Sequence, residues 1–124
     1  MGMMNTPKIH ESEYRFCLIM WEHEPVTAVE LVKLCQQQLG WKRTTTYTVI
    51  KRLTERGVLK NENGTVMALV SKEEAQAREI NELVEEKFQG SLPAFVAAFT
   101  RRKDISEDEL DEVQRMIDRI RKGG

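Results

Sequence analysis

The sequence predicts a mostly helical chain in which three helices are followed by a small β-hairpin and then by further helices. Through most of the chain, apolar residues recur every three or four positions, which is the period of a helix with one buried face. Between residues 58 and 70 this pattern gives way to two short β-like runs around Asn63-Gly64. Asn-Gly is the strongest short signal for a tight hairpin turn.

The first two helices are bounded by clear signals. The first is expected over about residues 11–23 and is ended by Pro25. The second begins at Thr27, which has the spacing of a capping box with Glu30, and is closed by Gly40. The apolar stripe of the first helix is Tyr14, Cys17, Leu18 and Trp21. The stripe of the second helix is Leu31, Leu34, Cys35 and Leu39.

The third helix, residues 42–56, has two chemically different faces. Val49, Ile50 and Leu53 lie together on one face with Thr46. The opposite face carries threonines and basic residues, although threonine is a mediocre helix former and surfaces selected for stability favour Glu, Lys and Ala. This outer face is therefore better explained by binding than by folding.

Charge is concentrated around this helix. The net charge of the chain is −1, but residues 42–60 hold six basic residues against Glu55 alone. Three helices followed by a hairpin, with Val26 placed to add a third strand, is the order of a winged helix-turn-helix domain, whose third helix enters the major groove of DNA. Lys and Arg neutralise phosphates, and Thr offers a hydroxyl and a methyl to base edges. The predicted DNA-binding residues on this helix are Lys42, Arg43, Thr44, Thr45, Thr48, Lys51 and Arg52.

Three further helical segments follow, beginning near Ser71, at Ser91 and at the capping box of Ser106 and Glu109. Each of these helices has an apolar stripe on one face and charged residues on the opposite face. Exposed apolar stripes of this kind most often pack against a second copy of the chain related by two-fold symmetry. The alternative is a monomer in which they fold back on the rest of the chain. The predicted dimer interface is Ile80, Leu83, Val84, Phe88, Phe95, Phe99, Leu110, Val113 and Ile117.

These patterns divide the chain into a flexible tail (1–8), a winged-helix DNA-binding domain (9–71) and a helical dimerisation domain (72–124). No phosphate loop, nucleophile elbow or zinc-peptidase helix is present, so no enzyme and no cofactor are expected. Cys17 and Cys35 lie in helical apolar stretches and are expected to be buried thiols, without the spacing of a metal site. With no apolar run long enough to cross a membrane and no signal peptide, the chain is expected in the cytoplasm.

Several motifs together resemble the penicillinase-repressor family (the BlaI/MecI/CopY repressors). They are Ile9 to Tyr14, Trp21, the stretch WKRTTTYTVIKRL from Trp41 to Leu53, Gly57 to Leu59, and Gly64 to Val66. The most specific piece is the tryptophan followed by a Thr-rich helix that ends in Arg52-Leu53-Thr54-Glu55-Arg56-Gly57. The similarity covers about residues 9–121.

The resemblance implies a homodimeric transcriptional repressor that binds a palindromic operator, controls a resistance-type operon and is released by proteolysis or by a partner such as a sensor protease. It implies DNA contacts by Arg43, Thr44, Thr45 and Thr48, with Lys51 and Arg52 on phosphate. The family's wing often has a basic residue after its glycine, where this chain has Thr65, which joins the predicted DNA-binding residues.

The resemblance also exposes two departures. Family members that respond to β-lactams are cut at an Asn-Phe bond, and the matching candidate for cleavage here is Ala98-Phe99, with alanine in place of asparagine. The copper-responsive branch ends in a C-x-C motif, which this chain lacks. The sequence therefore leaves the inducing signal open.

Two other classes of function remain open on the sequence. A winged domain can serve as a protein-interaction module without binding DNA, and the wing, residues 61–65, carries one acid and no basic residue. Weak dependence of binding on salt would favour that alternative. A small-molecule or metal sensor is suggested only by Cys17, Cys35 and six methionines, and metal retained after purification would favour it.

Overall fold

The computed structural model describes residues 6–101 and 104–123, and the chain forms two compact units that divide between Glu82 and Leu83. This division lies within α4 (Lys72–Lys87), whose first turns belong to the first unit. The domain boundary expected from the sequence, 71/72, stays a prediction. The first unit contains α1 (Glu11–His23), β1 (Val26–Thr27), α2 (Ala28–Leu39), α3 (Arg43–Glu55), β2 (Leu59–Glu62), β3 (Thr65–Ala68) and most of α4 (Lys72–Lys87). The second unit contains the end of α4, α5 (Leu92–Arg101) and α6 (Glu107–Gly123).

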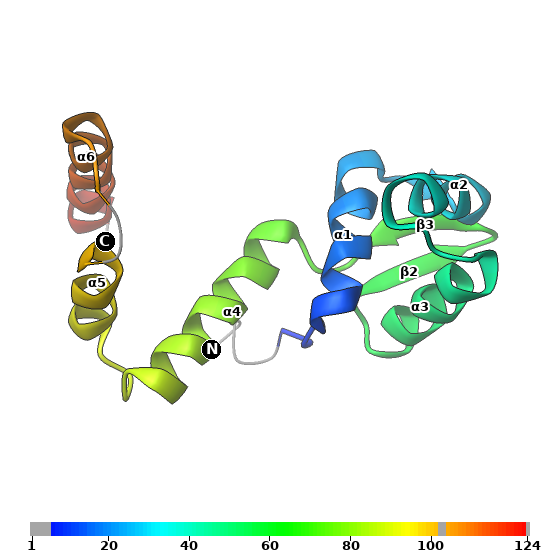
Figure 1. Ribbon diagram of the computed structural model, residues 1–124, viewed down its shortest axis with the longest axis horizontal. Coiled ribbons are helices and arrows are strands. Elements are labelled where there is room, and N and C mark those ends of the chain that lie inside the picture. The colour runs from blue at the N-terminus through cyan, green and yellow to red at the C-terminus, as the bar shows by residue number, and fades with distance from the viewer. Residues whose placement is uncertain (1–5, 102–103, 124) are drawn as a thin grey trace. The chain divides into compact units, whose positions relative to one another are not determined.

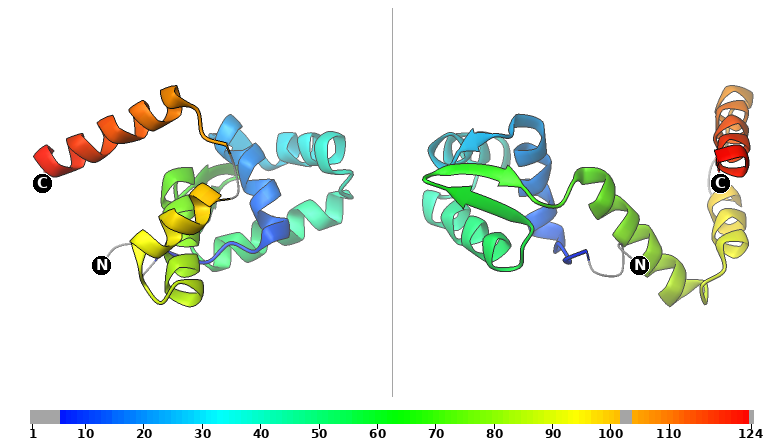
Figure 2. Two further views of the ribbon diagram at one scale, coloured as in Figure 1. Left: turned by 60° about the vertical axis from the view of Figure 1, so that its left-hand side comes forward. Right: turned by 180° about the vertical axis from the view of Figure 1, so that it is seen from behind.

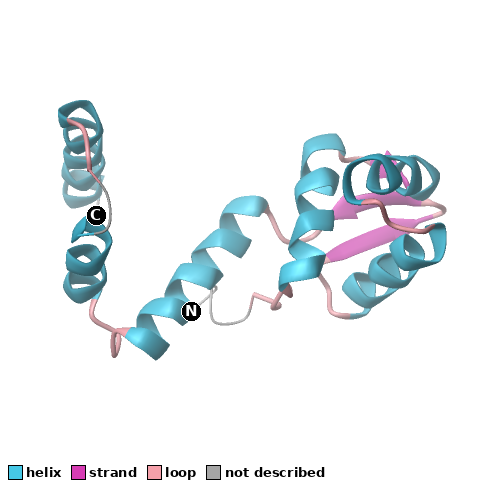
Figure 3. Cartoon of the chain, viewed as in Figure 1, coloured by secondary structure: helices cyan, strands magenta, loops and turns pink. Residues whose placement is uncertain are grey.

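The first unit has the predicted winged-helix architecture. Three helices pack on one another, and a small antiparallel sheet in the order β1-β3-β2 lies beside them (Figures 1 and 3). Val26 pairs with Val66, so the short β1 is the third strand that the sequence suggested. The hairpin turn is formed by Asn63 and Gly64, both at positive φ (54° and 88°), as a tight turn of this type requires.

The core of this unit joins the helices to the hairpin. The inner face of α3 is buried, including Thr46, together with the start of β2 and the middle of β3. Figure 2 shows α3 running alongside the hairpin. Burial of each large apolar side chain contributes roughly 1.5–3 kcal/mol, and this cluster is the main source of stability. Its fully buried side chains include Phe16, Met20, Leu31, Leu53, Val58, Leu59 and Val66.

The predicted apolar stripe of α1 did not coincide with the face of the helix that is buried. Phe16 and Met20 are fully buried, whereas Leu18, assigned to the stripe, is 40% exposed. Tyr14 and Trp21 are only partly buried, at the edge of the buried face. The reason is that α1 packs against both α2 and β3, so its buried face is wider than a single i, i+3, i+4 stripe and is centred elsewhere.

Helix ends follow the capping signals. The Thr27 hydroxyl accepts a hydrogen bond from the Glu30 N–H at 3.1 Å, as predicted. Ser71 and Glu74 form a capping box that the sequence pattern also contains but that was not recognised: Glu74 N–H donates to the Ser71 hydroxyl, and Ser71 N–H donates to the Glu74 carboxylate (3.0 and 2.9 Å). α4 therefore has a well-defined start.

The second unit is built around aromatic contacts. The rings of Phe88 and Phe95 meet edge to face with centroids 5.7 Å apart, and Phe95 stacks on Phe99 at 6.3 Å. All the described residues of α6 are exposed. An amphipathic helix exposed along its whole length gains little stability from its own propensity. In the part of the chain that the structure describes, no helix combines the length and apolar character needed to span a bilayer.

A buried ion pair joins α1 to the end of α3. Glu13 is 3% exposed, and its carboxylate accepts hydrogen bonds from the Arg56 guanidinium and from the His10 N–H. Burial by itself raises the pKa of Glu13, but these hydrogen bonds and the charge of Arg56 hold the pKa below its ordinary value. Glu13 therefore stabilises the fold in its charged form.

We expect Glu13→Gln to lower the free energy of unfolding by about 1–3 kcal/mol at pH 7, because a hydrogen-bonded buried charge pair is broken. A depressed pKa means that the stabilisation is present above the ordinary value of 4.5 and is lost as the pH falls below it. Urea unfolding at pH 7 and at pH 3 measures both effects. The variant should differ from the parent at pH 7 and approach it at pH 3, whereas the exposed Glu11→Gln control should match the parent at both. A constant difference at all pH values would contradict the assignment.

Candidate nucleic-acid interface

The outer face of α3 is the candidate interface. All seven of the residues predicted on this helix and at its start are exposed, while Thr46, Val49, Ile50 and Leu53 are buried beneath them. The structure therefore places the predicted residues on one surface that takes no part in the core. That surface consists of Lys42, Arg43, Thr44, Thr45, Thr48, Lys51 and Arg52.

The start of α3 is fixed by an aromatic stack. Gly40 takes a left-handed conformation (φ 69°) that ends α2 and turns the chain. Trp41 then stacks on Phe16 of α1, with nearly parallel rings and centroids 6.4 Å apart. Because Phe16 is fully buried, Trp41 connects the turn to the core and fixes where the exposed Lys42 and Arg43 begin.

Arg43 is held by Tyr47, a residue that the sequence analysis did not single out. The Arg43 guanidinium carbon lies 5.6 Å from the centroid of the Tyr47 ring, one helical turn later. A cation over an aromatic face contributes about 0.5–1 kcal/mol at an exposed site. The signal was available as an i, i+4 Arg–Tyr spacing. Restricting the guanidinium lowers the entropy cost of placing it on a ligand.

The exposed threonines are not equivalent. The Thr48 hydroxyl donates a hydrogen bond to the Thr44 carbonyl at 2.8 Å, so in this conformation its hydrogen is used within the helix. Toward a ligand, Thr48 then presents two things: oxygen lone pairs that accept, and a methyl group. In DNA, accepting groups fit the amino groups of adenine or cytosine, and the methyl fits that of thymine.

Two of the six basic residues counted around α3 are engaged elsewhere. Arg56 is bonded to Glu13 and donates through Nη1 to the Lys8 carbonyl at 2.8 Å. Lys60 pairs with Glu62 at 3.6 Å. Among the residues that the structure describes, no ion pair engages the other four. The cations left for an anionic ligand are Lys42, Arg43, Lys51 and Arg52.

The wing offers little charge. Its turn is held by two hydrogen bonds, from the Gly64 N–H to the Asn61 side chain (3.0 Å) and from the Ala28 N–H at the start of α2 to the Gly64 carbonyl (2.8 Å). Thr65, the predicted wing contact, lies in β3 opposite Glu62 and is only half exposed. The wing turn is therefore fixed in place and nearly neutral.

The predicted dimer-interface residues lie on or beside α4, α5 and α6. Six of them are exposed: Ile80, Leu83, Phe99, Leu110, Val113 and Ile117. Val84 is already buried in the single chain, and Phe88 and Phe95 are half-buried through their ring contacts. The candidate cleavage bond, Ala98–Phe99, lies inside α5.

The two cysteines have the environment of core residues. Cys17 and Cys35 are fully buried. Burial raises the pKa of Cys17 to about 12 and also raises the pKa of Cys35, so both thiols stay protonated and unreactive at neutral pH. Within the described ranges, no group of three or more His, Cys, Asp or Glu side chains is arranged to hold a metal ion.

Comparison with known proteins identifies the family. The family model described as penicillinase repressor matches residues 9–119, nearly the whole chain. The chain belongs to the penicillinase repressor family. This confirms the resemblance found in the sequence, and the fold is that of a winged-helix regulator of transcription.

Curated relatives are similar over almost their full length. The methicillin resistance regulatory protein MecI of Staphylococcus aureus strain Mu50 is 24% identical over 118 residues, covering 92% of this chain and 96% of the relative. An uncharacterised 16.5 kDa protein of Latilactobacillus sakei is 26% identical over 117 residues, covering 91% and 80%. Among solved structures, Staphylococcus aureus MarR in complex with salicylate and kanamycin has 20% identity and a TM-score of 0.45, covering 91% of this chain and 71% of that one.

Proposed function

We propose that this protein is a homodimeric transcriptional repressor without catalytic activity, and that it binds a palindromic operator through α3. The observation that carries the proposal is the exposed face of Thr and basic residues on α3, whose opposite face is locked into the core. Membership of the penicillinase repressor family supports it. The relatives named MecI are methicillin resistance regulatory proteins, and we infer that this chain likewise controls a resistance-type operon.

The proposed contacts follow from the chemistry of each side chain. Arg43, held by Tyr47, has a guanidinium group, whose planar fork of donors suits a bidentate contact with guanine or a phosphate. Thr44, Thr45 and Thr48 read base edges. Lys42, Lys51 and Arg52 neutralise phosphates, and Thr65 in the neutral wing contributes at most a hydroxyl contact to the backbone.

The dimer is proposed from the exposed apolar side chains of the C-terminal helices. α6 alone exposes five: Leu110, Val113, Met116, Ile117 and Ile120. Covering such a stripe with its own copy by two-fold symmetry is the common solution in soluble proteins. A symmetric dimer presents two copies of α3, which then read half-sites about one helical turn apart.

Release of the operator is proposed to come from proteolysis or from a sensor-protease partner that disrupts the dimer. The candidate bond, Ala98–Phe99, lies within α5, where Thr100 also bonds to the Ala97 carbonyl. A protease therefore needs α5 to open locally before the bond enters an active site, and the rate of cleavage then depends on the stability of α5.

The experiment that tests this function is selection from a library of random duplexes at two salt concentrations, followed by sequencing of the retained DNA. We expect enrichment of a palindrome with half-sites about one turn apart, and affinity that falls steeply as salt rises. No enrichment, with weak binding that does not respond to salt, would refute the proposal and favour a protein-interaction module. The indication for such a module is the wing, residues 61–65, which carries one acid and no basic residue.

Two lysines provide a matched test of the phosphate contacts. Lys51→Gln should weaken binding uniformly across sequences and lower the slope of log affinity against log salt by about 1, because one phosphate contact is lost. Lys60→Gln removes the same charge from a residue that pairs with Glu62, and its slope should match that of the parent. Equal slopes for the two variants would mean that α3 does not face the phosphates as proposed.

The dimer is tested on α6. Ile117→Glu should weaken self-association at least a hundredfold, because an unpaired charge in an interface costs about 3–5 kcal/mol. Arg115→Gln changes the net charge by the same amount on the opposite side of the helix and should leave the dimer intact. Sedimentation velocity over a range of concentrations measures both. Dimers of unchanged strength in Ile117→Glu would place the interface elsewhere.

A further inference from the structure

The segment before α1 lies between the end of α3 and the first turns of α4. Two arginines donate hydrogen bonds to the backbone of this segment. Arg56, which directly follows α3, donates to the Lys8 carbonyl at 2.8 Å. Arg78 of α4 donates through Nε to the Thr6 carbonyl at 2.7 Å. The segment thus connects α3 to α4, although the two arginines are far apart in the sequence.

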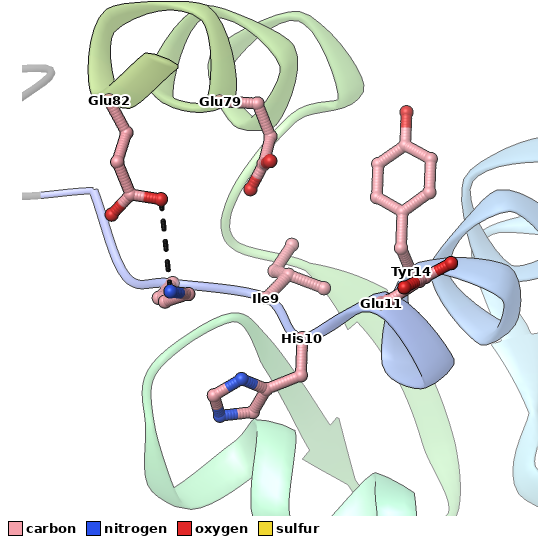
Figure 4. A pocket seen from close by; sticks show the side chains of 7 residues that line it. Ile9, His10, Glu11, Tyr14, Glu79 and Glu82 are labelled. Atoms are coloured by element: carbon pink, nitrogen blue, oxygen red, sulfur yellow. Dashed lines mark ion pairs between the residues drawn. The ribbon is translucent and has the colours of Figure 1, made fainter. Parts of the chain in front are cut away.

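Side-chain ion pairs reinforce the connection. The Lys8 ammonium lies 3.7 Å from the Glu82 carboxylate, a contact shown in Figure 4. The same carboxylate, through its other oxygen, accepts from the Arg78 guanidinium at 3.3 Å. Arg78 and Glu82 are both partly shielded from solvent, with 24% and 30% of their side chains exposed, so these pairs are screened less than fully exposed ones.

The segment is itself stiff. Pro7 fixes its own φ and restricts Thr6 to extended conformations, which limits how the two bonded carbonyls move relative to each other. Two residues later, Ile9 is buried in the core of the first unit. The segment is therefore anchored at one end by packing and along its length by the arginines.

Apolar packing against the core of the first unit holds α4 only near its start. Of the described residues of α4, Ala75 joins the core of the first unit, while Ile80 is 44% exposed. An open pocket of about 470 Å³ lies beside this part of α4, the segment and α1; Ile9, Tyr14, Glu79 and Glu82 are among its lining residues (Figure 4). Over residues 76–82, no side chain of α4 belongs to that core, and the contacts of Arg78 and Glu82 with the segment hold the helix in place.

We propose that residues 6–9, Arg56, Arg78 and Glu82 form a positioning clasp that fixes the direction of α4 relative to the recognition helix α3. The inference rests on the proposed function. α4 is one continuous helix that runs from the first unit into the second. The angle at which it leaves the first unit therefore helps to set the distance between the two copies of α3 in a dimer, and with it the spacing of half-sites that the dimer accepts.

Arg78→Ala opens the clasp at α4 without touching α3. We expect its affinity for a duplex with a single half-site to stay within about twofold of the parent. On the palindrome its affinity should fall at least tenfold, and its preference among palindromes whose spacers differ by single base pairs should flatten. Lys72→Ala removes an exposed cation from the same helix and serves as the control for charge. It should keep the spacing profile of the parent.

A second variant changes no charge. Pro7→Gly keeps every hydrogen-bonding partner but loosens the segment, and we expect it to flatten the spacing profile in the same direction as Arg78→Ala and less strongly. Amide hydrogen exchange provides an independent readout. Residues 76–82 of α4 should exchange faster in both variants, while the amides of α1 and α3 keep the protection of the parent, which also verifies that the first unit is folded.

The outcomes separate the clasp from the function on which it rests. If the parent enriches no palindrome, the proposed function fails, and exchange of residues 76–82 that is unchanged in both variants would overturn the clasp as well. If the parent does, an unchanged spacing profile in Arg78→Ala and Pro7→Gly overturns the clasp. An equal loss on half-site and palindrome also overturns it, because Arg78 would then act on DNA affinity itself and not on the placement of α4.

Discussion

The candidate interface depends on the burial of one face of α3. Val49, Ile50 and Leu53 lie in the core that joins α3 to α2 and β2, and this packing fixes the rotation of the helix about its own axis. Because the helix is held by that face, its outer residues need make no contribution to folding. The threonines and cations there are available to a ligand, and their arrangement is as rigid as the core that supports them.

The sequence predicted the order of elements because each boundary has a local cause. The Thr27 cap, the Gly40 turn and the Asn63-Gly64 hairpin are all determined by neighbouring residues. The buried face of α1 was misplaced because it depends on which elements cover the helix. Leu18 and Phe16 are equally apolar in sequence, and only the packing of α2 and β3 on α1 distinguishes the exposed side chain from the buried one.

Part of the candidate site could likewise be predicted from the sequence, and part could not. Periodicity was sufficient to place Lys51 and Thr48 on the exposed face of α3. It could not reveal that Arg56 is bound to Glu13, 43 residues away, because a count of charges does not distinguish a paired cation from a free one. Contacts between side chains distant in the sequence decide how many of the basic side chains in a segment remain unpaired and can bind an anionic ligand. Those contacts follow from the tertiary fold.

The two-faced construction of α3 has an evolutionary consequence. A change at Thr44, Thr45 or Thr48 alters what the helix presents without creating a cavity or a buried unpaired group, so its cost in stability is small. Duplicated copies of such a gene can therefore change the side chains of this face through single substitutions while they retain one scaffold. The folding of the protein places little restriction on which side chains these three positions carry.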